Sequence, residues 1–104
     1  MIEDIDPDTL AVRIAAWTTV VLDIREEARF RDGGIPDALC IPFGELPIGL
    51  RGLPVETPLA IVCQTGEESR AVAPLLWNLG YRKIAILKGG FASYVERGLP
   101  LTKR

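Results

Sequence analysis

The chain has 104 residues, of which 48% are hydrophobic and 25% charged, and its formal net charge at pH 7 is -2. This length and composition predict one globular domain, spanning residues 1–104, with a single hydrophobic core. They exclude the basic surface typical of nucleic-acid binding, a polybasic membrane-binding patch and a membrane-spanning helix, so we expect neither nucleic acid nor membrane as a partner.

The counts of cysteine and histidine narrow the chemistry further. The chain has two cysteines and no histidine. Two cysteines cannot form a disulfide framework or a four-thiolate metal site, so we expect no metal and no other cofactor. Without histidine, the chain has no Ser–His or Cys–His catalytic pair. Its acidic start, Met1-Ile2-Glu3-Asp4, has no hydrophobic signal segment, and we therefore expect a cytoplasmic protein with reduced thiols.

The start of the chain predicts a strand, a helix and a second strand. Ile2–Ile5 alternates apolar and acidic residues, which is typical of a short edge strand. The run Asp6-Pro7-Asp8 is a helix start, and apolar residues follow it at helical spacing up to Trp17, which we expect in the core or half-buried. Thr19–Ile24 is rich in β-branched residues and apolar on both faces, which predicts a parallel strand covered by helices on both sides.

The middle of the chain gives weaker signals. Arg25–Phe30 predicts a short helical turn, and Ala38–Ile41 predicts a short strand. Cys40 lies inside that apolar strand, so we expect it to pack in the core. Leu46–Arg51 predicts only a weak helix, because the glycine within it disfavours helix formation by about 1 kcal/mol relative to alanine.

The clearest pattern surrounds the second cysteine. The apolar run Leu59–Cys63 predicts a buried strand, and a polar loop with Gly66 at its centre separates this strand from a helix. Trp77 in this helix is expected in the core or half-buried. Pro74 predicts a kink or a delayed start of the helix, and Gly80 predicts its end.

Three further elements complete the pattern. Ile84–Leu87 predicts another buried strand, Gly89-Gly90 a tight turn, and Phe91–Glu96 a last short helix. Because strands alternate with helices, the sequence predicts an α/β domain with a mainly parallel sheet.

Cys63 is the main candidate for chemistry, because it ends a strand and precedes a helix. Ligands of open α/β sheets bind at this carboxyl edge of the sheet. The next helix directs its free N–H groups and positive dipole end at the loop, which favours a reactive thiolate and can hold an anion. The alternative is a small apolar cysteine that packs at the end of a core strand. Position alone leaves both interpretations open.

Asp23 and Arg25 end the strand predicted at residues 19–24. We therefore expect them at the same edge of the sheet as Cys63. Two roles remain open for them, a structural ion pair that anchors a loop, or a direct part in shaping the site around the cysteine.

Several segments along the chain match one known pattern when they are taken together. In the first half they are Val21-Leu22-Asp23-Ile24-Arg25, Phe30 through Ala38, and Ile41-Pro42. In the second half they are Cys63-Gln64-Thr65-Gly66-Glu67-Glu68-Ser69 and Leu87-Lys88-Gly89-Gly90-Phe91. Together they resemble the rhodanese domain family, the Cys63 segment its active-site loop and the last segment its late glycine turn. The similarity covers nearly the whole chain in order, without large gaps.

This resemblance implies both a fold and an activity. The fold is a sheet of five mostly parallel strands flanked by helices, and the activity is that of a sulfurtransferase. Cys63 would accept a sulfane sulfur as a persulfide and pass it to a nucleophile. The substrate-binding loop that the resemblance implies consists of Gln64, Thr65, Gly66, Glu67, Glu68 and Ser69. From their positions in the sequence, we expect Asp23, Arg25 and Arg70 to support this site.

The charges of the loop depart from the family pattern. Gln64 and Glu68 stand where the family usually carries basic residues, Glu67 adds a further negative charge, and Arg70 is the only cation nearby in the sequence. At about 7 Å and an effective dielectric near 40, each glutamate costs a thiolate about 1 kcal/mol, whereas the helix N-terminus returns about 0.3–1 kcal/mol. We therefore expect no net activation of the thiol unless Arg70 turns inward, and a dianion such as thiosulfate should be a poor donor.

The donor that fits better is a neutral or monoanionic persulfide, on a small thiol or on a partner protein, and we expect a monomer or weak dimer. The alternative function is a catalytically weak binding module of the same family, whose acidic loop recognises a basic partner. A phosphatase or arsenate reductase is disfavoured, because Arg70 lies one residue too far from Cys63 for such loops and the glutamates would repel a phosphate.

Overall fold

Five parallel strands form the centre of the computed structural model, which describes residues 2–102. They are β1 (Ile2–Ile5), β2 (Val20–Asp23), β3 (Leu39–Cys40), β4 (Leu59–Val62) and β5 (Ile84–Leu87). Their order in the sheet is β1-β5-β4-β2-β3, and each neighbouring pair is parallel. The two central strands β4 and β5 are buried along their whole length, as expected when helices cover both faces.

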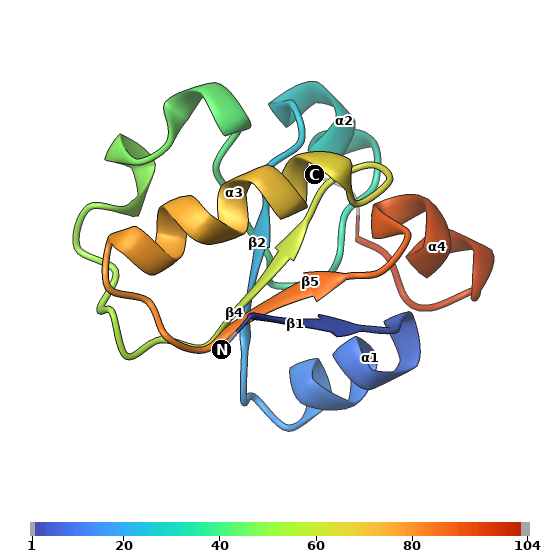
Figure 1. Cartoon of the computed structure of the whole chain (residues 1–104). Helices are drawn as coiled ribbons and strands as arrows, with labels where there is room; N and C mark the ends of the chain where they lie inside the picture. Colours follow the sequence, from blue (N-terminus) through green and yellow to red (C-terminus); the bar gives the residue numbers. More distant parts are fainter. Residues whose placement is uncertain (1, 103–104) are drawn as a thin grey trace.

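The helices lie on both faces of this sheet (Figure 1). One face is covered by α3 (Glu67–Asn78) together with two short 3₁₀ turns, η1 (Phe43–Glu45) and η2 (Ile48–Leu50). The other is covered by α1 (Pro7–Ala15), α2 (Glu27–Asp32) and α4 (Gly90–Glu96). The predicted α/β fold, a single domain with a five-stranded parallel sheet flanked by helices, is confirmed. The predicted range, 1–104, includes Met1, Lys103 and Arg104, which lie outside the described residues.

Buried side chains form two hydrophobic clusters, one on each face of the sheet, because successive side chains of a strand point to opposite faces. Ile61 of β4 packs with α3, whereas its neighbours Ala60 and Val62 pack with α1, α2 and α4. Cys63, one residue beyond β4, belongs to the core on the α3 face. The strand therefore places this cysteine under the start of the helix that follows it in sequence.

Most predicted elements form within a few residues of their expected positions, and β1 is an edge strand as predicted. The weak helix expected at residues 46–51 is reduced to η2, a single 3₁₀ turn. Cys40 packs against the core of the α1 face, but from an edge strand, so its side chain is only half-buried.

Two details of the helices differ from alternatives that the sequence suggested. Helix α3 begins at Glu67 and contains Pro74, so of the two alternatives given for Pro74 the delayed start is excluded. Trp17 is neither in the core nor half-buried, since 78% of its surface is exposed. The reason is that α1 ends at Ala15 and Trp17 has a φ of 56°, a left-handed conformation that leaves the helical path. Trp77 is half-buried against the α3-side core, as predicted.

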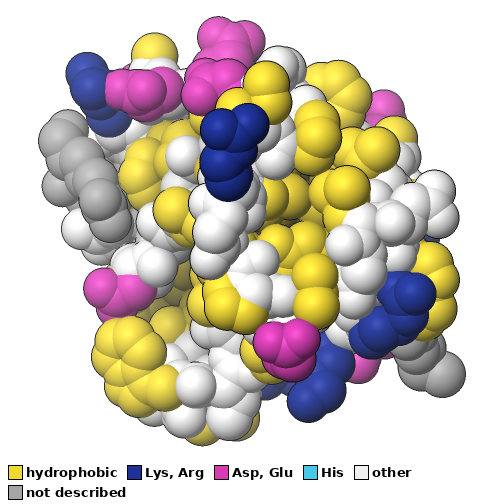
Figure 2. All heavy atoms as spheres, turned by 90° about the vertical axis from the view of Figure 1, so that its left-hand side faces the viewer, with side chains coloured by type: hydrophobic (Ala, Val, Ile, Leu, Met, Phe, Trp, Pro, Cys, Tyr) yellow, Lys and Arg dark blue, Asp and Glu magenta, His cyan; other side chains and the backbone are white. Residues whose placement is uncertain are grey.

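Figure 2 shows the face on the left-hand side of Figure 1, where the 3₁₀ turns and the end of α3 lie. Hydrophobic side chains spread over much of this face, with charged side chains scattered between and around them. Exposed hydrophobic residues include Ile48 in η2, Val55 in the loop after η2, and Leu79 directly after α3. Within residues 2–102, none of the helices has the length and apolar character needed to cross a bilayer.

Candidate active site

The ends of β2 and β4 bring together the residues expected at one edge of the sheet. Asp23, the last residue of β2, is the register partner of Val62, the last residue of β4. Cys63 follows Val62 directly, and the backbone N–H of Ile24 donates to the carbonyl of Val62 at 2.9 Å. Asp23, Arg25 and Cys63 therefore share the carboxyl edge of the sheet, as predicted.

The loop after β4 curls around the sulfur of Cys63. The backbone N–H of Gly66 donates a hydrogen bond to Sγ of Cys63, with an N–S distance of 3.0 Å. Gly66 is the N-cap of α3 and has a φ of 102°, which only glycine adopts without strain. The side chain of Cys63 is almost completely buried. The N–H group that points at its sulfur stabilises negative charge there.

A second glycine turn fixes this loop from the side of α4. The N–H groups of Phe91 and Ala92, in the first turn of α4, donate to the carbonyls of Cys63 and Gln64 at 2.7 and 3.1 Å. This approach requires glycine at position 90, because a Cβ there would lie 2.5 Å from the carbonyl oxygen of Cys63. The late glycine turn therefore holds the backbone of the cysteine loop in place.

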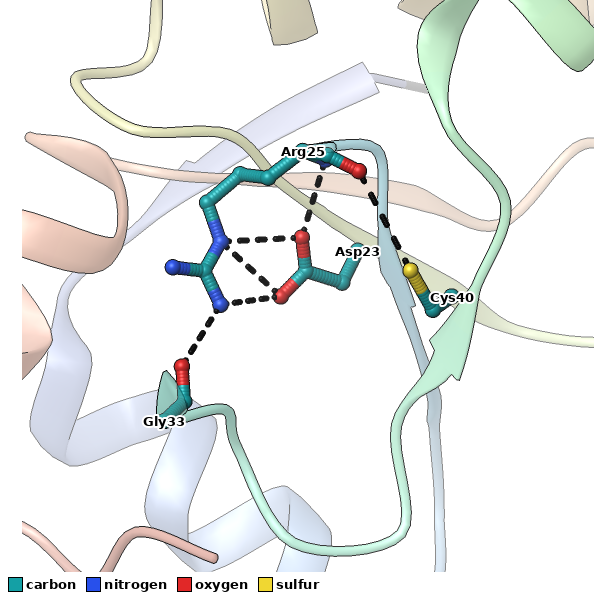
Figure 3. Close-up of polar contacts among 4 residues, drawn as sticks. All are labelled: Asp23, Arg25, Gly33 and Cys40. Carbon is teal, nitrogen blue, oxygen red and sulfur yellow. Dashed lines mark hydrogen bonds and ion pairs between the residues drawn. The ribbon is translucent and has the colours of Figure 1, made fainter. Parts of the chain in front are cut away.

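Asp23 and Arg25 form a buried ion pair beside the loop (Figure 3). Nη2 and Nε of Arg25 donate to the carboxylate of Asp23 at 2.9 to 3.2 Å, and Nη2 also donates to the carbonyl of Gly33 at 2.9 Å. The guanidinium carbon lies 3.7 Å from the centre of the Phe91 ring. The pair thus ties the end of β2 to the end of α2 and to α4, which is the loop-anchoring role left open by the sequence.

The second thiol, Cys40, has a less reactive environment. Its thiol makes a long contact to the carbonyl of Arg25, with an S–O distance of 3.9 Å (Figure 3). Burial, together with the nearby carboxylate of Asp23, raises the pKa of Cys40 above its usual value. The thiolate of Cys40 therefore forms only at a higher pH than that of an ordinary cysteine.

The cations around the cysteine loop differ from those that the sequence suggested. Nη2 of Arg70 lies 3.2 Å from Oδ1 of Asp4, so this side chain turns toward β1 and does not point into the loop. The cations near the loop are instead Arg25 and Arg29, which line a cleft together with Gln64. The condition under which Arg70 was expected to activate the thiol, that it turns inward, is therefore not met. Proximity in sequence did not show that α2 supplies a cation to the cleft.

The cleft has a volume of about 350 Å³ and lies between α2, η1 and the start of α3. Of the predicted loop residues, Gln64 and Glu68 line it, whereas Thr65 and Glu67 are exposed without lining it. Gly66 and Ser69 are buried, and the hydroxyl of Ser69 has no hydrogen-bond partner among residues 2–102. The complete lining consists of Ile24, Arg25, Glu26, Arg29, Pro42, Phe43, Gly44, Gln64 and Glu68.

Sequence reasoning missed Arg29 and Phe43 as parts of the site. Both residues could have been expected at the site from the order of the elements. Arg29 is in α2, which follows β2, and Phe43 is in η1, which follows β3. Parallel strands end at the same edge of the sheet, and this edge carries Cys63. The N–H of Phe43 donates to the carbonyl of Ile24 at 3.0 Å, which fixes this wall of the cleft. Among the residues that the structure describes, no group of three or more Cys, Asp or Glu side chains is placed to bind a metal ion.

Comparisons with known proteins identify the family of this chain. The family model of the rhodanese-like domain matches residues 6–97. A protein of Allochromatium vinosum named sulfurtransferase is 34% identical over 102 residues, which cover 97% of this chain and 95% of the relative. The thiosulfate sulfurtransferase GlpE of Tolumonas auensis is 31% identical over 72 residues, covering 69% of this chain and 68% of the relative.

Solved structures show the same fold. The crystal structure of a rhodanese-related protein from Thermoplasma volcanium superposes with a TM-score of 0.89, with 29% identity, and the match covers 98% of this chain and 99% of the other. The rhodanese-like domain protein of Staphylococcus aureus gives a TM-score of 0.84 with 25% identity over 98% of both chains. The chain therefore belongs to the rhodanese-like domain family, and its activity is sulfur transfer.

Proposed function

We propose that Cys63 carries the transferred sulfur as a persulfide. The observation that supports this role most directly is the hydrogen bond from the N–H of Gly66 to Sγ of Cys63, inside a loop that α4 holds in place. The negative charge that this bond stabilises lies on Sγ of Cys63, both in the thiolate that attacks the donor and in the thiolate that is regenerated when the sulfur leaves.

The transfer takes place in two displacement steps, and neither step needs an added oxidant or reductant. The thiolate of Cys63 attacks the outer sulfur of a donor persulfide R–S–SH, the donor S–S bond breaks, and its electron pair leaves with R–S⁻. Cys63 then carries –S–SH. In the second step an acceptor thiolate attacks the outer sulfur, and the S–S bond at Cys63 breaks, which regenerates the Cys63 thiolate. The chain contains no histidine, so no imidazole serves as a base in either step.

We propose that thiosulfate is a poor donor and a persulfide the preferred one. Relatives of this chain are named thiosulfate sulfurtransferases. In this chain, however, the cleft beside the loop contains the carboxylates of Glu26 and Glu68, which repel a dianion. A persulfide on a small thiol or on a partner protein carries less charge. We place the reaction in the cytoplasm, where free cysteines stay reduced, and expect a monomer or weak dimer.

The test is to load the protein with sulfur and locate it. Wild type, Cys63→Ser and Cys40→Ser are incubated with a small-molecule persulfide, separated from it, and measured by intact mass before and after cyanide. We expect one added sulfur atom, removed by cyanide, on wild type and Cys40→Ser, and none on Cys63→Ser. Labile sulfur on Cys63→Ser would contradict the assignment. A wild type that holds no sulfur from any donor would indicate a binding module.

A further inference from the structure

The charged side chains around the cleft are not equivalent, because only some of them are neutralised by partners. Arg25 already binds the carboxylate of Asp23 and the carbonyl of Gly33. Arg29, on the exposed side of α2, makes no salt bridge among the described residues. The cleft therefore presents one cation that is available to a ligand.

The two carboxylates of the cleft are also available. Glu26 is the N-cap residue of α2, but its side chain makes no capping hydrogen bond. Glu68 is in the first turn of α3 and makes no salt bridge within residues 2–102. Glu26 and Arg29 are three residues apart, a spacing at which opposite charges on a helix can pair, yet neither forms a salt bridge with any described residue. One free cation and two free anions thus line a single cleft.

On this basis, which rests on the function proposed above, we propose that the cleft selects a small thiol or persulfide that carries an amino-acid head. Arg29 binds its carboxylate, and Glu68, with Glu26, binds its ammonium group. A ligand of purely negative charge would meet both carboxylates, and a ligand of purely positive charge would meet the guanidinium. A zwitterion places each of its charges opposite a complementary one.

The remaining surface of the cleft fits the rest of such a ligand. Ile24, Pro42 and Phe43 supply an apolar wall for the methylene groups, and Gln64 places the cleft directly beside the cysteine loop. The volume of about 350 Å³ is at the lower end of the range in which proteins bind small molecules. Arg29 and Gln64 also border a second hollow of about 280 Å³, which gives room for a peptide longer than one amino acid.

The test measures sulfur transfer from Cys63 persulfide to four small thiols in single turnover. Cysteine carries both charges, 3-mercaptopropionate only the carboxylate, cysteamine only the ammonium group, and 2-mercaptoethanol neither. The variants are Arg29→Gln and Glu68→Gln. Arg31→Gln is the matched control, because Arg31 is on the same helix but forms a salt bridge with Glu27 and does not line the cleft. Rates are compared for the same thiol across variants, so the intrinsic reactivity of each thiol cancels.

For Arg29→Gln, we expect the rate with cysteine and with 3-mercaptopropionate, relative to 2-mercaptoethanol, to fall about three- to fivefold, the size expected for one exposed ion pair. For Glu68→Gln, the relative rate should fall for cysteine and cysteamine and rise for 3-mercaptopropionate. Arg31→Gln should change none of these ratios. Free cysteine and glutathione, assayed side by side, distinguish a single amino acid from a peptide as the preferred form.

Two failures can be told apart. If none of the donors places sulfur on Cys63, the proposed function is wrong, and this inference is wrong with it. If Cys63 loads and transfers sulfur, but Arg29→Gln and Glu68→Gln change the four rates by a common factor, the proposed function stands and the selection of an amino-acid head is overturned. The same conclusion follows if Arg31→Gln changes the ratios as much as Arg29→Gln does.

Discussion

Reversing the charge at position 68 tests whether the cleft controls the choice of donor. Glu68 is exposed and lines the cleft, so its charge acts through a medium close to water. At about 7 Å and a dielectric near 80, one carboxylate repels a dianion by about 1 kcal/mol. Glu68→Arg removes this repulsion and adds a similar attraction, a total of about 2 kcal/mol. That corresponds to about a thirtyfold gain in kcat/KM for thiosulfate at low salt.

The assay compares kcat/KM for thiosulfate and for a neutral persulfide, at low and at high ionic strength. The gain for thiosulfate should nearly vanish at 1 M salt, where the Debye length is about 3 Å, and the neutral donor should respond much less. Glu67→Arg is the matched control, because it makes the same change of net charge at a neighbouring residue that is also exposed but does not line the cleft. A gain below about threefold at low salt, or an equal gain in Glu67→Arg, would refute the reasoning.

Three further predictions concern the thiols, the loop and the ion pair. Cys63→Ser should lose the fast-alkylating thiol, and the remaining Cys40 should react only at a higher pH than a free cysteine, since its pKa is raised; alkylation rates from neutral to alkaline pH check this. Gly66→Val should lower sulfur transfer far more than thermal stability, whereas the same change at Gly52, also at positive φ but with open space around it, should spare transfer. Asp23→Ala should lower the free energy of unfolding by about 3–5 kcal/mol in urea, because it leaves a buried guanidinium unpaired; a loss below about 1 kcal/mol would contradict this.

Much of the site could be predicted from local sequence. The strand that ends just before Cys63 and the glycines at positions 66, 89 and 90 follow from hydrophobic runs and from backbone conformations that favour glycine. Asp23 and Arg25 could be placed at the same edge as Cys63, because parallel strands end at the same side of a sheet. The strand and the glycines depend on residues a few positions apart, and the shared edge follows from a general rule of parallel sheets, so the sequence alone contains this information.

Other features were decided only by how the elements pack. Trp17 has helical spacing from the apolar residues before it, but the end of α1 turns it into solvent. Arg70 is close to the loop in sequence, yet the neighbouring β1 offers the carboxylate of Asp4, and the guanidinium turns there. Arg29 is far from Cys63 in sequence, and the packing of α2 brings it to the cleft. Long charged side chains reach whichever partner the assembled fold places within a few ångströms, so their contacts depend on tertiary structure and not on sequence spacing.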